Sequence, residues 1–394
     1  MQYKYFTSDY IFINGQFVAE KVVVTDLEGT IVDILNIKDV DDSLIYKVNG
    51  ALIPGLINTH CHLELSHMKG KVNTGTSLLP FLNSVVSFRN IDQAIIDQAI
   101  IDADREMYDN GIVAVGDISN KVDTASVKAK SKMDYYTFVE NFDFLQDSMA
   151  TTTFLQYKTV FDQQSNEGNN KKSMVPHAPY TVSKSLLEKI KLFNPDQCTI
   201  SIHNQETPEE NKLFFDKTGQ FIDFYKGFGF DLSQFEAIGK SSIHYLLDQL
   251  NAKNKIILVH NTTAQVKDIN AAHDKFAQLF WASCPNANLF IENRLPNYQN
   301  FLDTQAKVTL GTDSLTSNWQ LSILEEVMTI QKFCSYISLE TCLQWATANG
   351  AEALGYEDRL GSIAVSKKPG LLAIDAINIG GKFILNSSRV DRLL

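Results

Sequence analysis

The amino-acid sequence predicts an α/β protein in which a (β/α)8 barrel is joined to a small β-sandwich domain. Two observations predict this fold class. The central part of the chain alternates eight apolar, strand-like runs with segments of helical spacing, and eight is the strand count of such a barrel. The two ends of the chain instead hold short strand-like runs separated by Gly, Asn and Pro.

Residues 1–52 and 358–394 are predicted to form the small domain together. Their strand-like runs lie at 10–15, 21–26, 30–35, 361–365, 370–375 and 382–386. Neither segment alone is long enough for a stable core, and each alone would leave unpaired strand edges. We therefore expect the two ends to meet in one β-sandwich.

The middle of the chain, residues 53–357, is predicted to be the barrel, of the TIM type. Its strand-like runs lie at 51–59, 111–118, 134–141, 172–177, 198–203, 255–260, 278–283 and 307–311. Segments of helical spacing lie between most of them, such as 91–110. The stretch 207–254 is long for a connection between strands, and we expect it to hold extra helices over the barrel mouth.

Composition and charge narrow the class of protein. The 394 residues allow one large domain and an appendage, at roughly 100–200 residues per domain. Hydrophobic residues make up 44% and charged residues 21%, as in an ordinary globular protein with a sizeable core. The formal net charge of −11 repels phosphate backbones and anionic lipids, so we expect neither nucleic acid nor membrane as a partner.

The sequence also predicts the compartment and the partners. No apolar run approaches the length of about 18 residues that a membrane span needs, and the first residues lack a signal-peptide pattern. The five cysteines are scattered and form no CxxC pair, which favours free thiols in a reducing compartment. We therefore expect a cytoplasmic protein with small-molecule partners, and a homodimer as its candidate assembly.

Histidines gather where the predicted strands end. Of the eight histidines, five lie at or just past such an end: His60, His62, His177, His203 and His260. The carboxyl ends of the strands form the functional face of a (β/α)8 barrel. A lone histidine on a strand is more often structural, but five coincidences with strand ends favour a metal site.

The chemistry of these side chains suits a divalent ion. Because residues two apart on a strand point to the same side, His60 and His62 can both face one ion. Asp313 follows the last strand-like run. Three imidazoles and one carboxylate suit Zn²⁺ or Fe²⁺ and leave a coordination position for water.

A carboxylate follows one of these histidines at a distance of three residues. Glu206 comes after His203 and can lie beside the ion without binding it. From there it can move a proton between a water molecule and a substrate nitrogen. The alternative is an exposed loop residue that belongs to the acidic run 207–210.

At these residues the sequence resembles the amidohydrolase superfamily, in particular its mononuclear-metal deaminase and chlorohydrolase branch. Within that branch it is similar to adenosine-type deaminases, among them the S-adenosylhomocysteine and aminodeoxyfutalosine deaminases. The resemblance extends from about residue 50 to 375 in the order of the family's motifs. The matching segments are 54–62, 177–183, 203–206, 259–260, 284–289, 311–318 and 346–351.

The resemblance implies a set of metal ligands. His60, His62, His203 and Asp313 would hold one divalent ion, Zn²⁺ first and Fe²⁺ as the alternative. We find no lysine placed to become the carboxylated bridge of the two-metal members, which supports a single ion. Asp313 would also take the proton of the attacking water.

The resemblance further implies a deamination. Hydroxide on the ion would attack a ring carbon that bears an amino group, as in a purine, and ammonia would leave. Glu206 would protonate the neighbouring ring nitrogen, and His260 would orient the hydroxide or stabilise charge. His177 and Glu64 would contact substrate, although a solvated loop position is the alternative for Glu64.

Two other functions fit the same residues. The first is another hydrolase that uses this site, an amidase, a lactamase or a chlorohydrolase that displaces chloride from a triazine. The second is a barrel that has lost catalysis and serves in assembly, against which the full set of candidate ligands counts.

Overall fold

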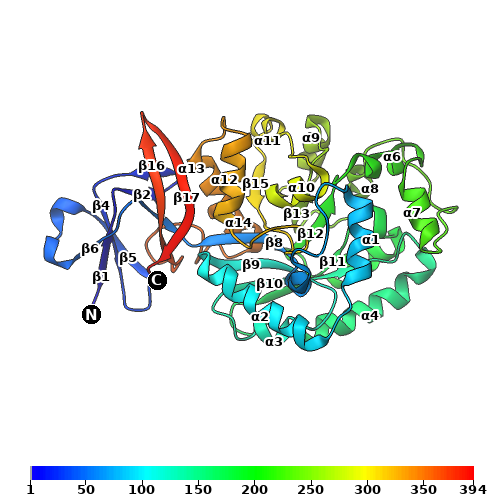
Figure 1. Cartoon of the computed structure of the whole chain (residues 1–394), viewed down its shortest axis with the longest axis horizontal. Coiled ribbons are helices and arrows are strands. Elements are labelled where there is room, and N and C mark those ends of the chain that lie inside the picture. The colour runs from blue at the N-terminus through cyan, green and yellow to red at the C-terminus, as the bar shows by residue number, and fades with distance from the viewer. Residues whose placement is uncertain (1) are drawn as a thin grey trace.

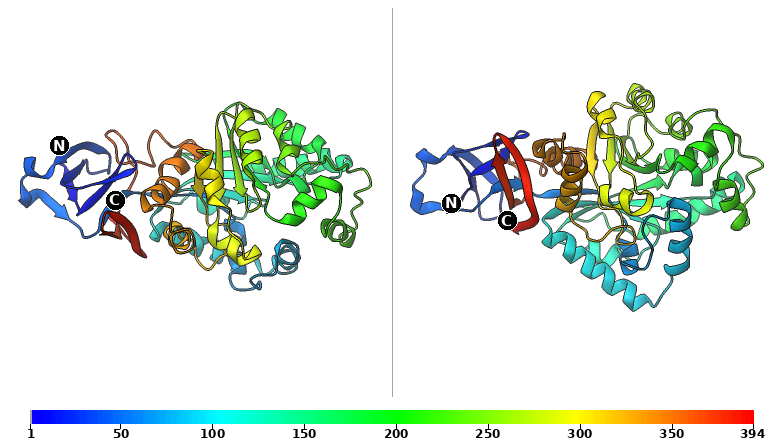
Figure 2. Two further views of the ribbon diagram at one scale, coloured as in Figure 1. Left: turned by 90° about the horizontal axis from the view of Figure 1, so that it is seen from above. Right: turned by 45° about the horizontal axis from the view of Figure 1, so that its top comes forward.

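The computed structural model describes residues 2–394 and shows two parts side by side along the longest axis of the molecule (Figure 1). A strand-rich part contains both chain termini, and the larger part contains the remaining strands and the helices. The two further views show the same separation (Figure 2). Within residues 2–394, no helix combines the length and the apolar character needed to cross a bilayer.

The larger part is built around eight parallel strands that form two four-stranded sheets. The first sheet has the order β11-β10-β9-β8 and the second the order β12-β13-β14-β15. The strands are β8 (Leu56–Cys61), β9 (Ile112–Ser119), β10 (Asp134–Asn141), β11 (Lys171–Pro176), β12 (Thr199–Asn204), β13 (Lys255–His260), β14 (Leu279–Ser283) and β15 (Lys307–Leu310).

The edges of these two sheets adjoin at both junctions. Between β11 and β12, the backbone N–H of His203 donates to the carbonyl of His177 at 2.9 Å. Between β15 and β8, the N–H of Asp313 donates to the carbonyl of His60 at 3.0 Å. The regular ladders nevertheless stop at these junctions, so the hydrogen bonding is that of two sheets and not of the one continuous sheet that the sequence predicts.

The first predicted strand, 51–59, is two strands in different sheets. β7 (Ala51–Pro54) belongs to the strand-rich part, and β8 begins at Leu56. The break falls at Gly55, where a Cβ atom would lie 2.3 Å from a methyl carbon of Val113 and 2.6 Å from the carbonyl oxygen of Pro369. Only glycine fits this close approach of three segments, and the chain passes there from one part to the other.

Helices follow most of the central strands, as the sequence predicts. The longest, α2 (Gln93–Asp109), begins after Asp92, whose side chain accepts from the N–H of Ala94, and it buries Ile96 and Ile100. The others are α1 (Leu78–Phe88), α3 (Ala125–Lys128), α4 (Ala150–Gln163), α5 (Lys184–Phe193), α6 (Pro208–Asp216), α7 (Phe221–Gly227), α8 (Ile243–Leu247), α9 (Val266–Lys275), α10 (Pro285–Glu292), α11 (Tyr298–Asp303), α12 (Ile323–Phe333), α13 (Leu339–Ala346) and α14 (Ala348–Leu354).

Short 3-10 helices complete the connections, and the extra helices expected in 207–254 are present as α6, α7 and α8. The 3-10 helices are η1 (Ile37–Asp39), η2 (Asp42–Leu44), η3 (Leu63–Met68), η4 (Asp147–Met149) and η5 (Pro179–Thr181).

Both chain ends contribute to the strand-rich part. One sheet has the order β5-β4-β1-β6, and the other the order β17-β16-β7-β2-β3. In the second sheet β16 pairs antiparallel with β7. Their strands are β1 (Lys4–Thr7), β2 (Tyr10–Ile13), β3 (Gln16–Val18), β4 (Lys21–Thr25), β5 (Ile31–Asn36), β6 (Ile45–Lys47), β16 (Leu371–Ile379) and β17 (Lys382–Arg392).

A separate apolar core joins the two sheets of this part. It includes Phe6 and Val23 from the first sheet, and Leu52 and Leu371 from the second. Residues far apart in the sequence therefore stabilise one another here.

We predict that removal of residues 365–394 destabilises the N-terminal segment. The truncation deletes β16 and β17, leaves one edge of β7 unpaired and takes Leu371 out of the shared core. Limited proteolysis followed by mass spectrometry should show faster cleavage before residue 50. Unchanged protection of that segment would contradict the dependence of one end on the other.

Candidate functional site

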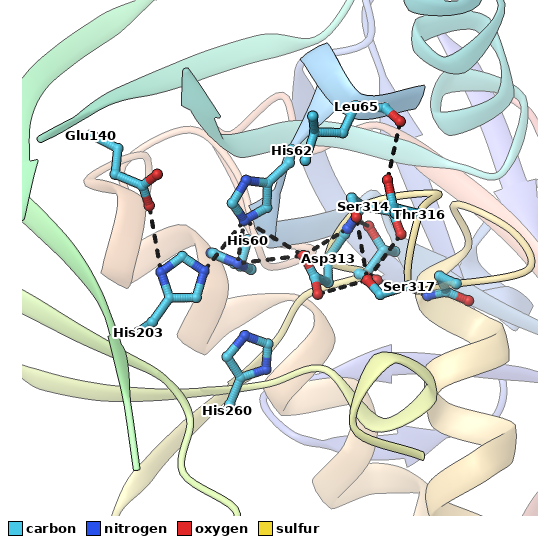
Figure 3. Close-up of polar contacts among 12 residues, drawn as sticks. His60, His62, Leu65, Glu140, His203, His260, Asp313, Ser314, Thr316 and Ser317 are labelled. Atoms are coloured by element: carbon cyan, nitrogen blue, oxygen red, sulfur yellow. Dashed lines mark hydrogen bonds and ion pairs between the residues drawn. The ribbon is translucent and has the colours of Figure 1, made fainter. Parts of the chain in front are cut away.

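The predicted histidines meet at the carboxyl ends of the central strands. His60 lies on β8, His203 on β12 and His260 at the end of β13, while His62 and Asp313 follow β8 and β15. Figure 3 shows the rings of His60, His62 and His203 and the carboxylate of Asp313 directed toward one region, with His260 on the other side of it. The sequence prediction that strand ends bring these residues together agrees with this arrangement.

Three of these side chains, His60, His62 and His203, form a group that could hold a metal ion, and the carboxylate of Asp313 lies beside them. His62 Nε2 lies 3.2 Å from His60 Nε2 and 3.3 Å from His203 Nε2. Asp313 Oδ1 lies 3.5 Å from His62 Nε2 and 3.8 Å from His60 Nε2. With zinc–nitrogen bonds of about 2.0–2.1 Å, tetrahedral geometry places ligand atoms roughly 3.3–3.4 Å apart, so the observed spacing suits such an ion.

The protonation of His203 directs one particular nitrogen to the ion. Its Nδ1 lies 3.0 Å from the backbone carbonyl of His177, which can only accept, so the proton is on Nδ1 and Nε2 is free to bind metal. Burial lowers the pKa of His203 and of His60 well below the usual value, which keeps both rings neutral. Neutral imidazole is the form that binds metals.

A second group of candidate ligands shares His203 with the first. It consists of Glu140, His177 and His203. Glu140 Oε1 approaches His203 at Nδ1, at 3.5 Å, and this nitrogen already donates to a carbonyl. The second group therefore does not form a separate complete site. Glu140 lies instead where an outer carboxylate can orient a histidine ligand.

Glu140 itself is a residue that the sequence analysis missed. It is 2% exposed, and within residues 2–394 its Oε1 atom has no hydrogen-bond partner. Burial raises the pKa of Glu140 to about 8. No quoted motif contains this residue, because a single Glu at the end of a strand carries no distinctive pattern.

His260 faces the ion site from the side opposite His62. Its Nδ1 donates to Asn288 Oδ1 at 2.9 Å, so Nε2 is left as the acceptor in the neutral ring. Nε2 lies 3.6 Å from Glu206 Oε2. Asn288 belongs to the segment 284–289 that the sequence analysis identified, although its role was not foreseen.

Glu206 is buried beside this histidine and is not a solvated loop residue. Glu206 is 6% exposed, and its Oε1 accepts from the hydroxyl of Tyr180 at 2.7 Å. Burial raises the pKa of Glu206 to about 8. A carboxyl group of this kind can both hold and release a proton near neutral pH.

The backbone turns sharply at the residues that carry the site. Gln205, His260 and Asp313 have φ angles of 48°, 73° and 57°, in the left-handed region that non-glycine residues rarely adopt. Such strain is typical of functional sites, where the surrounding structure holds it. For Asp313, the N–H of Ser314 donates to Oδ1 and the hydroxyl of Ser317 donates to Oδ2, both at 2.7 Å.

Glu326, on α12, connects the two segments that follow β14 and β15 at the site. Its carboxylate accepts from the side chains of Asn318 and Asn286 at 2.8 and 3.1 Å, and from the N–H of Asn286 at 2.8 Å. Asn318 also donates to the carbonyl of Thr312 at 2.7 Å, next to Asp313. The start of α10 after β14 and the loop after β15 are therefore both held by one fully buried carboxyl group, which no sequence motif indicated.

The two predicted substrate contacts are both largely enclosed. His177 Nδ1 lies 2.7 Å from the Thr181 hydroxyl, and burial lowers the pKa of His177 to about 3. Its ring centroid is 4.8 Å from that of His203, so it borders the site. Glu64 is 4% exposed, which excludes the solvated loop position.

The carboxylate of Glu64 has protein partners on both oxygens. Oε2 accepts from the N–H groups of Asn120 and Lys121 at 2.9 and 3.0 Å. Oε1 lies 3.3 Å from a guanidinium nitrogen of Arg89. Glu64 therefore ties the loop after β8 to the end of β9.

The chain is similar to known proteins over most of its length. A family model described as the amidohydrolase family matches residues 51–391. The adenosine deaminase of Helicobacter pylori is 27% identical over 332 residues, which cover 82% of this chain and 78% of that protein. The 5'-deoxyadenosine deaminase of Methanobrevibacter smithii is 26% identical over 365 residues, which cover 86% and 77%.

Solved structures share the fold. Helicobacter pylori aminofutalosine deaminase in complex with methylthio-coformycin superimposes with a TM-score of 0.77 at 22% identity, covering 97% of this chain and 100% of that one. An adenosine deaminase from Xanthomonas campestris with bound zinc has a TM-score of 0.73 at 20% identity, covering 98% and 94%.

We predict that the purified protein holds about one divalent ion per chain and that His62→Ala loses it. The substitution removes the nitrogen that contacts both other histidines. Elemental analysis measures the ratio. His67→Ala is the matched control, because His67 is also buried and its Nε2 contacts the carbonyl of Arg89 instead. A ratio near two, or a metal-loaded His62→Ala variant, would contradict the assignment.

We predict that Glu326→Gln weakens both the fold and the metal site. The amide nitrogen would face a donor of Asn286, which leaves buried donors unpaired and lowers the free energy of unfolding by about 1–3 kcal/mol. A chelator should also remove the ion faster, since the Asp313 loop loses its support. Glu325→Gln, on the same helix but bonded to Ser388, should leave metal retention unchanged. Equal behaviour of the two variants would argue against the connection.

Proposed function

This chain belongs to the amidohydrolase family, and we propose that it is a metal-dependent deaminase acting on the aminated ring of a purine nucleoside. The observation that carries the proposal is the position of Glu206. Its carboxyl is buried beside the metal-ligand cluster, with one oxygen bonded to Tyr180 and the other 3.6 Å from His260 Nε2. A deaminase needs a proton carrier of this kind, because a ring nitrogen must gain a proton and ammonia must leave.

In this proposal the ion is held by His60, His62, His203 and Asp313. When bound, a divalent ion supplies a nucleophile at neutral pH by lowering the pKa of a coordinated water to about 7. The second oxygen of Asp313 is held by Ser317, which keeps the carboxylate oriented while it accepts the proton of the attacking water.

In this proposal His260 acts on the attacking water, and Glu206 acts on the ring of the substrate. In its neutral form His260 has an acceptor at Nε2, which receives a hydrogen bond from the attacking water and fixes its direction. Glu206 gives its proton to the ring nitrogen next to the carbon that is attacked. The amino group then takes the proton that Asp313 accepted from the water and leaves as ammonia when its C–N bond breaks. The proton of the added hydroxyl group passes to Glu206, and the ring carbonyl forms.

Contacts to the rest of the substrate are assigned as part of the same proposal. His177 borders the site and is placed to contact the substrate directly. Glu64 binds a hydroxyl or amino group of the substrate at Oε1, in competition with Arg89. Its Oε2 is not available, because it accepts from two backbone N–H groups.

The relatives support a nucleoside substrate. Those at 26–27% identity are named as adenosine, 5'-deoxyadenosine and aminodeoxyfutalosine deaminases. Triazine hydrolase and atrazine chlorohydrolase are also structural neighbours, at 14–15% identity, a level that supports a common fold only. The histidine cluster and the buried carboxyl of Glu206 count against a non-catalytic role.

We also propose the full architecture and setting. Contacts at both sheet junctions support a closed (β/α)8 barrel that begins after Gly55, not at the predicted residue 53, and extends to residue 357. The shared core supports a β-sandwich formed by residues 2–54 and 358–394. Zn²⁺ is the ion we favour over Fe²⁺. Five free thiols fit a cytoplasmic setting. The homodimer stays a prediction, which light scattering would test.

We predict that the zinc-loaded protein releases ammonia from adenosine and 5'-deoxyadenosine, and that Glu206→Gln keeps its metal while kcat falls by about 10²-fold or more. Glutamine keeps the shape of the side chain but carries no exchangeable acid proton. Glu209→Gln is the control, because Glu209 contacts Lys212 and Gln220 rather than the site.

The same measurements separate the ways in which this proposal can fail. Absence of ammonia release across adenosine, 5'-deoxyadenosine, adenine and guanine would refute the deaminase. Loss of metal in Glu206→Gln would make Glu206 a ligand. Chloride release from a chlorotriazine without ammonia release from purines would favour the chlorohydrolase.

A further inference from the structure

We propose that Tyr180 is a positioning residue for proton transfer, because its phenol occupies Glu206 Oε1 and so reserves Oε2 for the substrate. This inference rests on the proposed function and deepens it. Tyr180 lies in η5, within the segment 177–183 that the sequence analysis identified, but no role for it followed from the motif. The proposal also gives the segment 207–254 a purpose.

The direction of the hydrogen bond is fixed by chemistry. The Tyr180 hydroxyl lies 2.7 Å from Glu206 Oε1, and Tyr180 is 1% exposed. Burial and the neighbouring Glu206 raise the pKa of Tyr180 well above its usual value, so the phenol keeps its proton and donates it. In a protonated carboxyl the carbonyl oxygen is the stronger acceptor, so the phenol at Oε1 favours a carboxyl proton on Oε2.

Oε2 is the oxygen that approaches His260, a residue that borders the ligand cluster with its ring centroid 5.3 Å from that of His203. It lies 3.6 Å from His260 Nε2, on the side of the ligand cluster. The backbone of Glu206 is held independently, since its N–H donates to Glu210 Oε2 at 2.9 Å and its carbonyl accepts from the Thr262 hydroxyl at 2.6 Å. With the main chain fixed, the carboxyl can move only by rotation about the side-chain bonds. The hydrogen bond from the phenol restricts that rotation.

Tyr180 is itself held by α7, which belongs to the segment 207–254. Its ring packs on Phe221, with centroids 4.7 Å apart, and its carbonyl accepts from the hydroxyl of Tyr225. Phe221 and Tyr225 are 0% and 1% exposed. This part of the long connection therefore supports the proton carrier through Tyr180.

The test compares Tyr180→Phe with Tyr245→Phe. Tyr245 is a matched control, because it is also buried, at 6% exposure, and its hydroxyl donates to a nearby carbonyl, that of Val182, at 3.0 Å. Each variant loses one phenolic hydrogen bond, but only Tyr180 contacts Glu206. We expect kcat for Tyr180→Phe to fall about 10- to 100-fold, with KM within about threefold and metal content unchanged. Tyr245→Phe should keep the kcat of the unmodified protein.

A double-mutant cycle makes the test specific to Glu206. In a Glu206→Gln background, Tyr180→Phe should lower kcat no further, because the group that it positions no longer carries a proton. An equal fold-loss in both backgrounds, equal kcat for the Tyr180 and Tyr245 variants, or a rise in KM in place of the fall in kcat would overturn the proposal. Where the unmodified protein deaminates no nucleoside, the proposed function falls together with this inference. An active protein that Tyr180→Phe leaves unchanged refutes the positioning role alone.

Discussion

The close approach of three imidazole nitrogens and one carboxylate oxygen is the constraint on which the rest of this structure depends. His62 Nε2 lies 3.2 Å from His60 Nε2 and 3.3 Å from His203 Nε2 in the protein interior, and Asp313 Oδ1 lies 3.5 Å from the same nitrogen. Burial favours the neutral rings, and neutral rings directed at one another are stabilised by a shared cation. The strand ends must therefore meet accurately, and Asp313 lies there with a left-handed φ of 57°.

That accuracy comes from groups outside the cluster. The carbonyl of His177 fixes the tautomer of His203, and Asn288 fixes that of His260. Glu326 links α10, which carries Asn288, to the loop that carries Asp313. Each support is a buried polar group with defined partners, in which an unpaired donor or acceptor is costly. The site is therefore rigid because its outer hydrogen bonds leave few alternative arrangements.

The two parts of the molecule place different demands on the chain. The larger part needs close contact between strand ends, whereas the strand-rich part needs both termini to complete one sheet and one core. The chain passes from one part to the other at Gly55. A side chain there would collide with Val113 and with the backbone at Pro369. A single backbone position thus allows a strand of one sheet to continue directly into a strand of another.

The sequence by itself determined which chemistry is present. The alternation of strands and helices, the histidines at strand ends and Glu206 three residues after His203 are local patterns, and spacing along one chain suffices to interpret them. Only the tertiary structure decided which atoms meet. Glu140 beside His203, Glu326 beside Asn318 and Tyr180 beside Glu206 join residues 63, 8 and 26 positions apart, and such contacts leave no periodic signal. The same reason hid the division of 51–59 into two strands, since apolar runs look alike whichever sheet they enter. Local pattern fixes the kind of side chain and its face, while the partner is chosen by packing between distant segments.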